Sequence, residues 1–325
     1  MKPFLLQVTE HILSNHNSLE NVLVVLPGKR GGLFLKKHLS DLIKKPFFAP
    51  KISTISELCE EATGEFVADK TTLLIHLFNT YSNVINQKQE NFDSFLLWGN
   101  ILLNDFNEID RQLINAHDLY ANLRNLQDIE DWSFNLHELS ARQIDFERFW
   151  HTAGKTYDLF NLKCSEVKIN YSGGLYKKLA LNIEKYIENL NYDKIYFSGF
   201  NALSKAEEKI ISSLCYSAKA EILWDVDEYY SLNPIHEAGY FFQKFKKNHP
   251  HLSTHFIGNY YLTEPKNINS YTCNGNIEQI SALRSLMTNE NEAGLNEAIV
   301  LCDESLIIPF LSNLPDRNKL NITMG

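Results

Sequence analysis

The sequence has no apolar run long enough to cross a lipid bilayer. Its longest runs, such as Val22 to Leu26 and Ala298 to Cys302, are far shorter than the roughly 20 residues that a spanning helix needs. The first residues, Met1-Lys2-Pro3, lead into an amphipathic segment and lack the features of a signal peptide. We therefore expect a cytoplasmic protein that has no membrane partner.

Close cysteine pairs are also lacking. The five cysteines are scattered, at Cys59, Cys164, Cys215, Cys273 and Cys302. Because no two of them have the short spacing of a zinc or redox motif, we expect neither disulfides nor a structural metal. His249, His251 and His255 lie close together, but they belong to a polar stretch beside Pro250, so a metal site is the less favoured interpretation.

A general surplus of positive charge is missing, since the formal net charge is −9. This excludes a protein that coats nucleic acid without selectivity, because such proteins need excess lysine and arginine facing the phosphates. Positive charge is instead concentrated between residues 29 and 51, where Asp41 is the single acid. The basic residues there are Lys29, Arg30, Lys36, Lys37, Lys44, Lys45 and Lys51. Any nucleic-acid site should be local to this stretch.

The composition that is present, 44% hydrophobic and 12% aromatic, is that of a folded globular protein. Apolar spacing predicts a helix over residues 4–15, and the β-branched run at residues 21–27 predicts a strand buried on both faces. Residues 28–32 read as a loop. It opens into a second helix with Leu35, Leu39, Leu42 and Ile43 on one side.

Residues 56–190 show mostly helical periodicity, and strand signals then return. We predict strands at 194–198, 220–224, 268–273, 297–302 and 320–323, and helices at 204–216, 277–288 and 305–314. This alternation predicts an α/β fold with a mostly parallel sheet covered on both faces. One discontinuous domain would comprise residues 1–55 and 191–325, interrupted by a helical insertion at 56–190. Because the sequence ends directly after a predicted strand, we expect a fragment of a longer protein.

Four segments carry a resemblance: VLVVLPGKRGGLFLKKHL (22–39), WGNILLNDFNEID (98–110), YFSGFNALSKAE (196–207) and LNITMG (320–325). In this order they resemble the amino-terminal half of AddB-like proteins, in the Bacteroidetes type of the PD-(D/E)XK nuclease superfamily. These proteins are helicase-nuclease subunits in double-strand-break repair. The resemblance implies a superfamily 1 helicase fold, with a RecA-like, P-loop NTPase-like sheet, a helical insertion and a nuclease farther along the chain.

The requirements for ATP hydrolysis are not met. No GxxxxGK[ST] phosphate loop occurs in the chain. The residues at 28–32 lack its spacing and hydroxyl, and three residues before the first helix leave no room for strand and loop. On the resemblance, Gly199 and Phe200 stand where two catalytic carboxylates would hold magnesium and orient water. We therefore expect no catalytic residues and no cofactor. Asp225, Asp227 and Glu228 read as a solvated cluster at a strand end.

The resemblance also points to a DNA contact. Residues 27–31 take the place of a loop that touches the phosphates of single-stranded DNA in active helicases. Lys29 and Arg30, beside a helix N-terminus, are the main candidates, and Lys36 is a further one, although Lys36 and Lys37 also suit a solvated helix face. For Lys29 and Arg30 the ordinary alternative is a solvated loop. Aromatic residues of the helical stretch, such as Trp98, could stack on bases, but their spacing favours core packing.

The interpretation that follows is a DNA-binding scaffold without ATPase activity, which positions a single-stranded or duplex DNA end for the nuclease, with an AddA-like helicase as partner. Two alternatives stay open. The chain could hold a partner helicase without touching DNA, or it could be an active nucleotide-binding enzyme whose phosphate loop has an unfamiliar sequence.

Overall fold

The computed structural model describes residues 2–85, 91–130, 141–253, 255–287, 298–314 and 321–322, with side chains except at 124–130, 141–148, 151 and 255. The chain forms two compact units, Met1–Thr263 and Glu264–Gly325. None of the helices in these described ranges combines the length and the apolar character that crossing a lipid bilayer requires.

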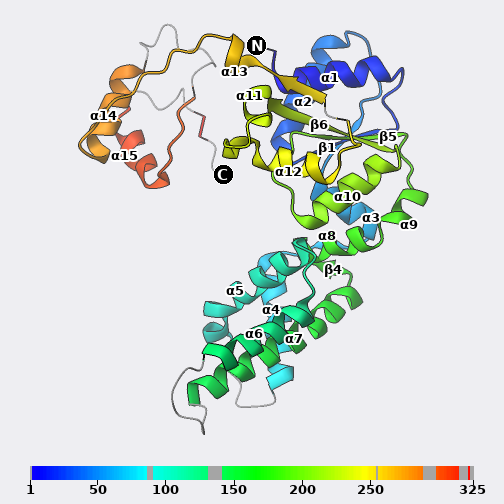
Figure 1. Cartoon of the computed structure of the whole chain (residues 1–325), viewed down its shortest axis with the longest axis vertical. Coiled ribbons are helices and arrows are strands. Elements are labelled where there is room, and N and C mark those ends of the chain that lie inside the picture. Colours follow the sequence, from blue (N-terminus) through cyan, green and yellow to red (C-terminus); the bar gives the residue numbers. More distant parts are fainter. Residues whose placement is uncertain are drawn as a thin grey trace. The chain divides into compact units, whose positions relative to one another are not determined.

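The first unit is built on a five-stranded sheet (Figure 1). Its strands are β1 (Val22–Leu26), β2 (Lys51–Thr54), β5 (Lys194–Ser198), β6 (Ala220–Asp227) and β7 (His255–Gly258). Their order is β2-β1-β5-β6-β7, and every neighbouring pair is parallel. The predicted α/β fold with a parallel sheet is thus confirmed. Strands that precede and follow the long helical stretch belong to this one sheet.

Both faces of the sheet are buried, as the apolar run of β1 predicts. Val22 and Val24 pack on one side, whereas Leu23 and Val25 pack on the other. The first face is covered by α1 (Phe4–Asn15) and α2 (Lys29–Leu42). The opposite face is covered by α3 (Ile55–Thr63), α8 (Ser172–Leu181), α9 (Ile183–Glu188), α10 (Lys205–Tyr216) and α12 (Tyr240–Asn248).

Four helices of the stretch between β2 and β5 form a bundle with a core of its own (Figure 1). They are α4 (Lys70–Ile85), α5 (Phe92–Arg111), α6 (Ala116–Glu130) and α7 (Ala141–Glu166). Phe95, Phe106 and Phe160 are fully buried among them, and Trp98 packs against this core. The predicted core packing of the aromatic residues is therefore confirmed for Trp98 and Phe106. Where the chain enters and leaves the bundle, β3 (Phe66–Val67) pairs with β4 (Ile169–Asn170).

A buried polar network joins α5 to α8. Asp110, 1% exposed, accepts hydrogen bonds from the hydroxyls of Tyr157 and Tyr171, and Lys177 Nζ lies 2.8 Å from its Oδ1. The backbone N–H of Gly173 donates to Asn107 Oδ1 at 2.7 Å. The two helices lie so close that a side chain at Gly173 would meet the Asn107 carbonyl oxygen at 2.2 Å.

A second polar network includes Lys178, the neighbour of Lys177 on α8. Glu65, which is buried, forms an ion pair with Lys178 and accepts a hydrogen bond from Asn170 Nδ2 at 3.0 Å. Adjacent lysines of one helix thus bind carboxylates from two different segments. Other residues of α8, including Leu175 and Leu179, belong to the core beneath the sheet, so this helix connects sheet and bundle.

The remaining elements are short. In the first unit they are α11 (Glu228–Ser231), η1 (Glu237–Gly239) and α13 (Tyr260–Thr263); in the second they are α14 (Asn276–Leu286), η2 (Glu304–Leu306) and α15 (Ile307–Ser312). Ile280, Leu306 and Phe310 form a small core in the second unit.

Several sequence predictions of secondary structure were wrong. Residues 268–273 and 298–302 form no strand, nor do residues 321 and 322; the rest of the predicted segments at 297–302 and 320–323 lies outside the described residues. Ile268 and Val300 are each more than 80% exposed. β-branched residues favour a strand only where a neighbouring strand and a packed face are available, and these segments have neither in the described part of the chain.

The predicted boundaries of the domains, at residues 55/56 and 190/191, stay a prediction. The predicted loop at 28–32 is corrected, because α2 already begins at Lys29. Gly32 is buried in its first turn, where an added side chain would meet Ile52 at 3.0 Å. This glycine serves close packing of helix on strand.

Candidate functional site

The carboxyl ends of the strands form one edge of the sheet, and the chain changes direction there. From β1 it passes to β2 on one side, and after the bundle it returns to β5 on the other side of β1. The helices that follow, α2 and α10, lie on opposite faces. In open α/β sheets such a switch point leaves a crevice where ligands bind. The candidate site therefore consists of residues 27–30 and 199–201.

The N-terminus of α2 is open. Its N-cap is Gly28, an extended residue that supplies no side-chain hydrogen bond, and the first turn contains no acid. Among the described residues, apart from its neighbours along the chain, no atom lies within 4 Å of the position that a Cβ on Gly28 would take. The first backbone N–H groups of a helix lack partners within the helix, and the positive end of its dipole favours an anion. This end of α2 can accept a phosphate group.

Lys29 and Arg30 lie in the first turn of α2 and not in a loop before it. Lys29 Nζ is 3.0 Å from Glu57 Oε1, but the lysine side chain is 81% exposed. Such a surface pair contributes little stability, so Lys29 can exchange this partner for a phosphate. Arg30 is exposed, and within the described part of the chain no ion pair of Arg30 is found.

Glu57 is the part of this site that sequence reasoning missed. It caps α3, where its carboxylate accepts from the Thr54 N–H at 2.8 Å. This hydrogen bond and the Lys29 ion pair lower the pKa of Glu57. The carboxylate is therefore charged at neutral pH and offsets part of the positive potential at α2. The Thr-x-x-Glu capping pattern was a signal for α3, although not for the contact with Lys29.

Lys36 is placed farther from the edge. It lies seven residues after Lys29, which puts it on the same side of α2 but about 10 Å along the axis. Both Lys36 and Lys37 are exposed. A ligand that reaches from the helix N-terminus to Lys36 must extend along the helix, as a polymer backbone can.

In the folded chain, acidic side chains from other segments neutralise part of the positive charge of residues 29–51. Lys51 Nζ binds Glu61 Oε2 at 2.7 Å and the Tyr192 hydroxyl at 2.9 Å, and the hydrogen bond to Glu61 raises the pKa of Lys51. Together with the Lys29–Glu57 pair, two of the basic residues are matched by acids from outside the stretch.

Gly199 and Phe200 follow β5 at the same edge. Gly199 has a φ of +75°, which a side chain disfavours, and the nearest atom to its missing Cβ is Cε1 of Phe4 at 3.6 Å. Phe200 is buried and packs against Phe197, with ring centroids 6.0 Å apart. An aromatic ring of α1 and a buried phenylalanine thus occupy this end of β5. Neither residue after β5 can bind magnesium or accept a proton.

Strand β6 is longer than predicted, so that Asp225 and Asp227 lie within it and Glu228 begins α11. Asp227 accepts from the N–H groups of Tyr229 at 3.0 Å and Tyr261 at 3.2 Å, and it caps α11. Asp227 therefore has a structural role, and Asp225 is exposed. The tyrosines packed around Asp227 were missed; the doublets at residues 229–230 and 260–261 were the available signal.

The histidine cluster forms no metal site in the described residues. His249 Nε2 lies 3.2 Å from Glu208 Oε1, and its Nδ1 lies 3.2 Å from the Tyr216 hydroxyl. His251 is exposed in a turn, and the side chain of His255 lies outside the described residues. Across the described part of the chain, no group of three His, Cys, Asp or Glu residues is arranged to hold a metal ion.

Neither the comparison with models of protein families nor the comparison with curated proteins finds a match for this chain.

Proposed function

We propose that this chain is a helicase-derived scaffold without ATPase activity that binds the phosphate backbone of DNA at the N-terminus of α2. The observation that carries the proposal is the open, uncapped start of α2, next to Lys29 and Arg30, at the switch point of the sheet. A RecA-like relationship is supported by the parallel sheet with helices on both faces and by the helical stretch between β2 and β5.

The lack of motor chemistry is a separate part of the proposal. Gly199 and Phe200 offer no carboxylate after β5, and Phe4 lies over Gly199. In the AddB-like arrangement that the resemblance implies, the DNA end would pass to a nuclease and an AddA-like helicase would supply the motor. Thermal unfolding with and without Mg-ATP tests this part, and we expect no shift.

Fluorescence-anisotropy titration with single-stranded, blunt and tailed oligonucleotides tests the DNA site. For single-stranded DNA, the Lys29→Ala, Arg30→Ala double variant should weaken binding and reduce the slope of log K against log salt by about 1.4, since each phosphate contact contributes about 0.7. The matched control is Lys44→Ala, Lys45→Ala. It removes the same charge from the same basic stretch and should leave the slope nearly unchanged.

A second pair of variants separates the helix N-terminus from the lysine and arginine charges. Gly28→Asn places a neutral cap on α2, whereas Gly28→Asp places a cap of similar size with a negative charge. Both should keep or raise stability, because Asn and Asp are favoured caps. DNA affinity should fall with Gly28→Asn and fall further with Gly28→Asp. Absence of binding by the unmodified chain in low salt would instead favour the scaffold that holds a partner helicase without touching DNA.

A further inference from the structure

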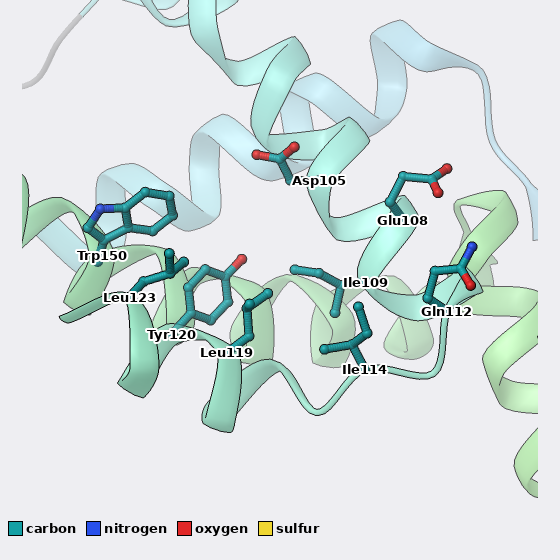
Figure 2. A pocket seen from close by; sticks show the side chains of 9 residues that line it. All are labelled: Asp105, Glu108, Ile109, Gln112, Ile114, Leu119, Tyr120, Leu123 and Trp150. Carbon is teal, nitrogen blue, oxygen red and sulfur yellow. The ribbon is translucent and has the colours of Figure 1, made fainter. Parts of the chain in front are cut away.

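A pocket of about 270 Å³ lies in the helical bundle, between α5, α6 and Trp150 of α7 (Figure 2). Its floor is apolar and its rim is acidic. The lining residues are Asp105, Glu108, Ile109, Gln112, Ile114, Leu119, Tyr120, Leu123 and Trp150. The pocket belongs wholly to the first unit and is independent of the candidate DNA site.

Asp105 and Glu108 give this pocket its charge. They are three residues apart on α5, which puts both carboxylates on one side of the helix. Burial against the apolar residues raises the pKa of Asp105. The negative charge at this rim would attract a cationic ligand, whereas a phosphate would be repelled.

Tyr120 is the second, independent indication of a ligand. The residue is only 5% exposed, and its hydroxyl forms no hydrogen bond within the described part of the chain. In Figure 2 this hydroxyl points into the pocket, toward the side from which Asp105 projects. A buried hydroxyl without a partner is destabilising. A donor group entering the pocket would satisfy it.

We propose that this pocket binds an arginine side chain presented by a partner protein. A guanidinium offers five N–H donors in a plane, which suit the Asp105 carboxylate and the Tyr120 oxygen, while the Glu108 carboxylate, which points away from Tyr120 in Figure 2, adds negative charge at the rim. The apolar stem of arginine suits the floor, and its flat head can stack on the Trp150 ring. The volume is below the roughly 300–1,000 Å³ of pockets for small ligands, and a single anchoring side chain suits it better.

A protein source is supported by the surface beside the pocket. Leu97 and Ile101 are 82% and 61% exposed, and at four-residue spacing they lead along α5 toward Asp105. An amphipathic helix that carries two apolar residues and one arginine would match this stripe and the pocket together. Exposed apolar residues in line with an acidic pocket are typical of a docking surface for such a helix.

The first test uses blocked arginine, N-acetyl-arginine amide, and its neutral analogue N-acetyl-citrulline amide, with the indole N–H signal of Trp150 as readout. We expect a saturable shift with a millimolar dissociation constant for arginine and at least tenfold weaker binding of citrulline. Tyr120→Phe and Asp105→Asn should each weaken arginine binding about tenfold. Tyr120→Phe removes no existing hydrogen bond, so it should fold normally. Asp118→Asn, an exposed acid of α6 outside the pocket, is the matched control.

The second test uses a 14-residue alanine-based helical peptide with two leucines and one arginine at four-residue spacing. It should bind at least tenfold more tightly than blocked arginine, and Leu97→Ser should weaken the peptide but not blocked arginine. A peptide that binds no more tightly would assign the pocket to free guanidine compounds and overturn the protein partner. Equal binding of citrulline, no saturable shift, or full affinity in Tyr120→Phe and Asp105→Asn would overturn the arginine site itself. DNA binding by these variants should be unchanged.

Discussion

Replacing Asp110 by leucine perturbs the buried polar network between α5 and α8. The change leaves the Lys177 ammonium without its partner 2.8 Å away and removes the acceptor of two tyrosine hydroxyls. Loss of one member of a buried ion pair costs about 3–5 kcal/mol. Lys177 is 28% exposed and keeps the Tyr157 hydroxyl at 2.7 Å, while the Tyr171 hydroxyl keeps Asn161 Oδ1 at 3.0 Å. These remaining partners place the loss at the lower end of that range, so we expect the free energy of unfolding to fall by about 3 kcal/mol.

Urea denaturation followed by tryptophan fluorescence measures this loss. All four tryptophans precede residue 225, so the signal reports the first unit. Asp118→Asn, on the surface of α6, should change stability by no more than about 0.5 kcal/mol. Adding Lys177→Met to Asp110→Leu should recover part of the loss, with a coupling energy of about 1–3 kcal/mol. A loss below about 1 kcal/mol for Asp110→Leu, or strict additivity in the double variant, would refute the reasoning.

Two further predictions concern packing and pH. Gly173→Ala should lower stability by about 1–3 kcal/mol, because the added carbon meets the Asn107 carbonyl oxygen at 2.2 Å. Gly154→Ala, whose added carbon lies 3.4 Å from the Tyr120 ring, should be neutral or slightly stabilising. Thermal unfolding of both variants measures the difference, and equal effects would contradict the packing argument. Burial, followed by the charge of a nearby lysine, lowers the pKa of His16, so the unfolded chain takes up its proton first and stability is lost as pH falls through about 6.5. His16→Gln should therefore lose less stability than the unmodified chain between pH 7.5 and 5.5 in urea titrations, and identical losses would exclude this role.

Elements with strong local signals were predictable from the sequence. The apolar run of β1 and the helical spacing of α1 match the observed bounds within a residue. Helix α10 begins where Ser204 and Glu207 form a reciprocal capping box. Such signals act within one turn or one strand, so they do not depend on the rest of the fold.

Elements that depend on distant partners were not predictable. The edge strands β2 and β7 have four residues each, and both were missed because pairing with β1 and β6 defines them. Conversely, the apolar segment around Ile268 has strand composition but no partner strand in the described ranges. β-propensity describes the fit to a pleated surface and not the presence of that surface.

The candidate site was predictable only in part. The order of strand and helix around Lys29 and Arg30 followed from local pattern, although both residues were predicted in a loop and lie in the first turn of α2. The pairing of Lys29 with Glu57 did not, because it depends on how α3 follows β2. The unpartnered hydroxyl of Tyr120 was also beyond sequence reasoning, since only the packing of α5, α6 and α7 makes that residue buried.

The pairing of β3 with β4 has a consequence for how this chain can tolerate changes in length. It brings the start and the end of a segment of about one hundred residues together, and the side chains of Glu65 and Asn170 are joined by a hydrogen bond of 3.0 Å. Because both ends are fixed there, residues gained or lost within loops of the bundle need not alter the register of β2 or β5. The bundle can therefore vary in length and surface while the geometry of the sheet edge is maintained.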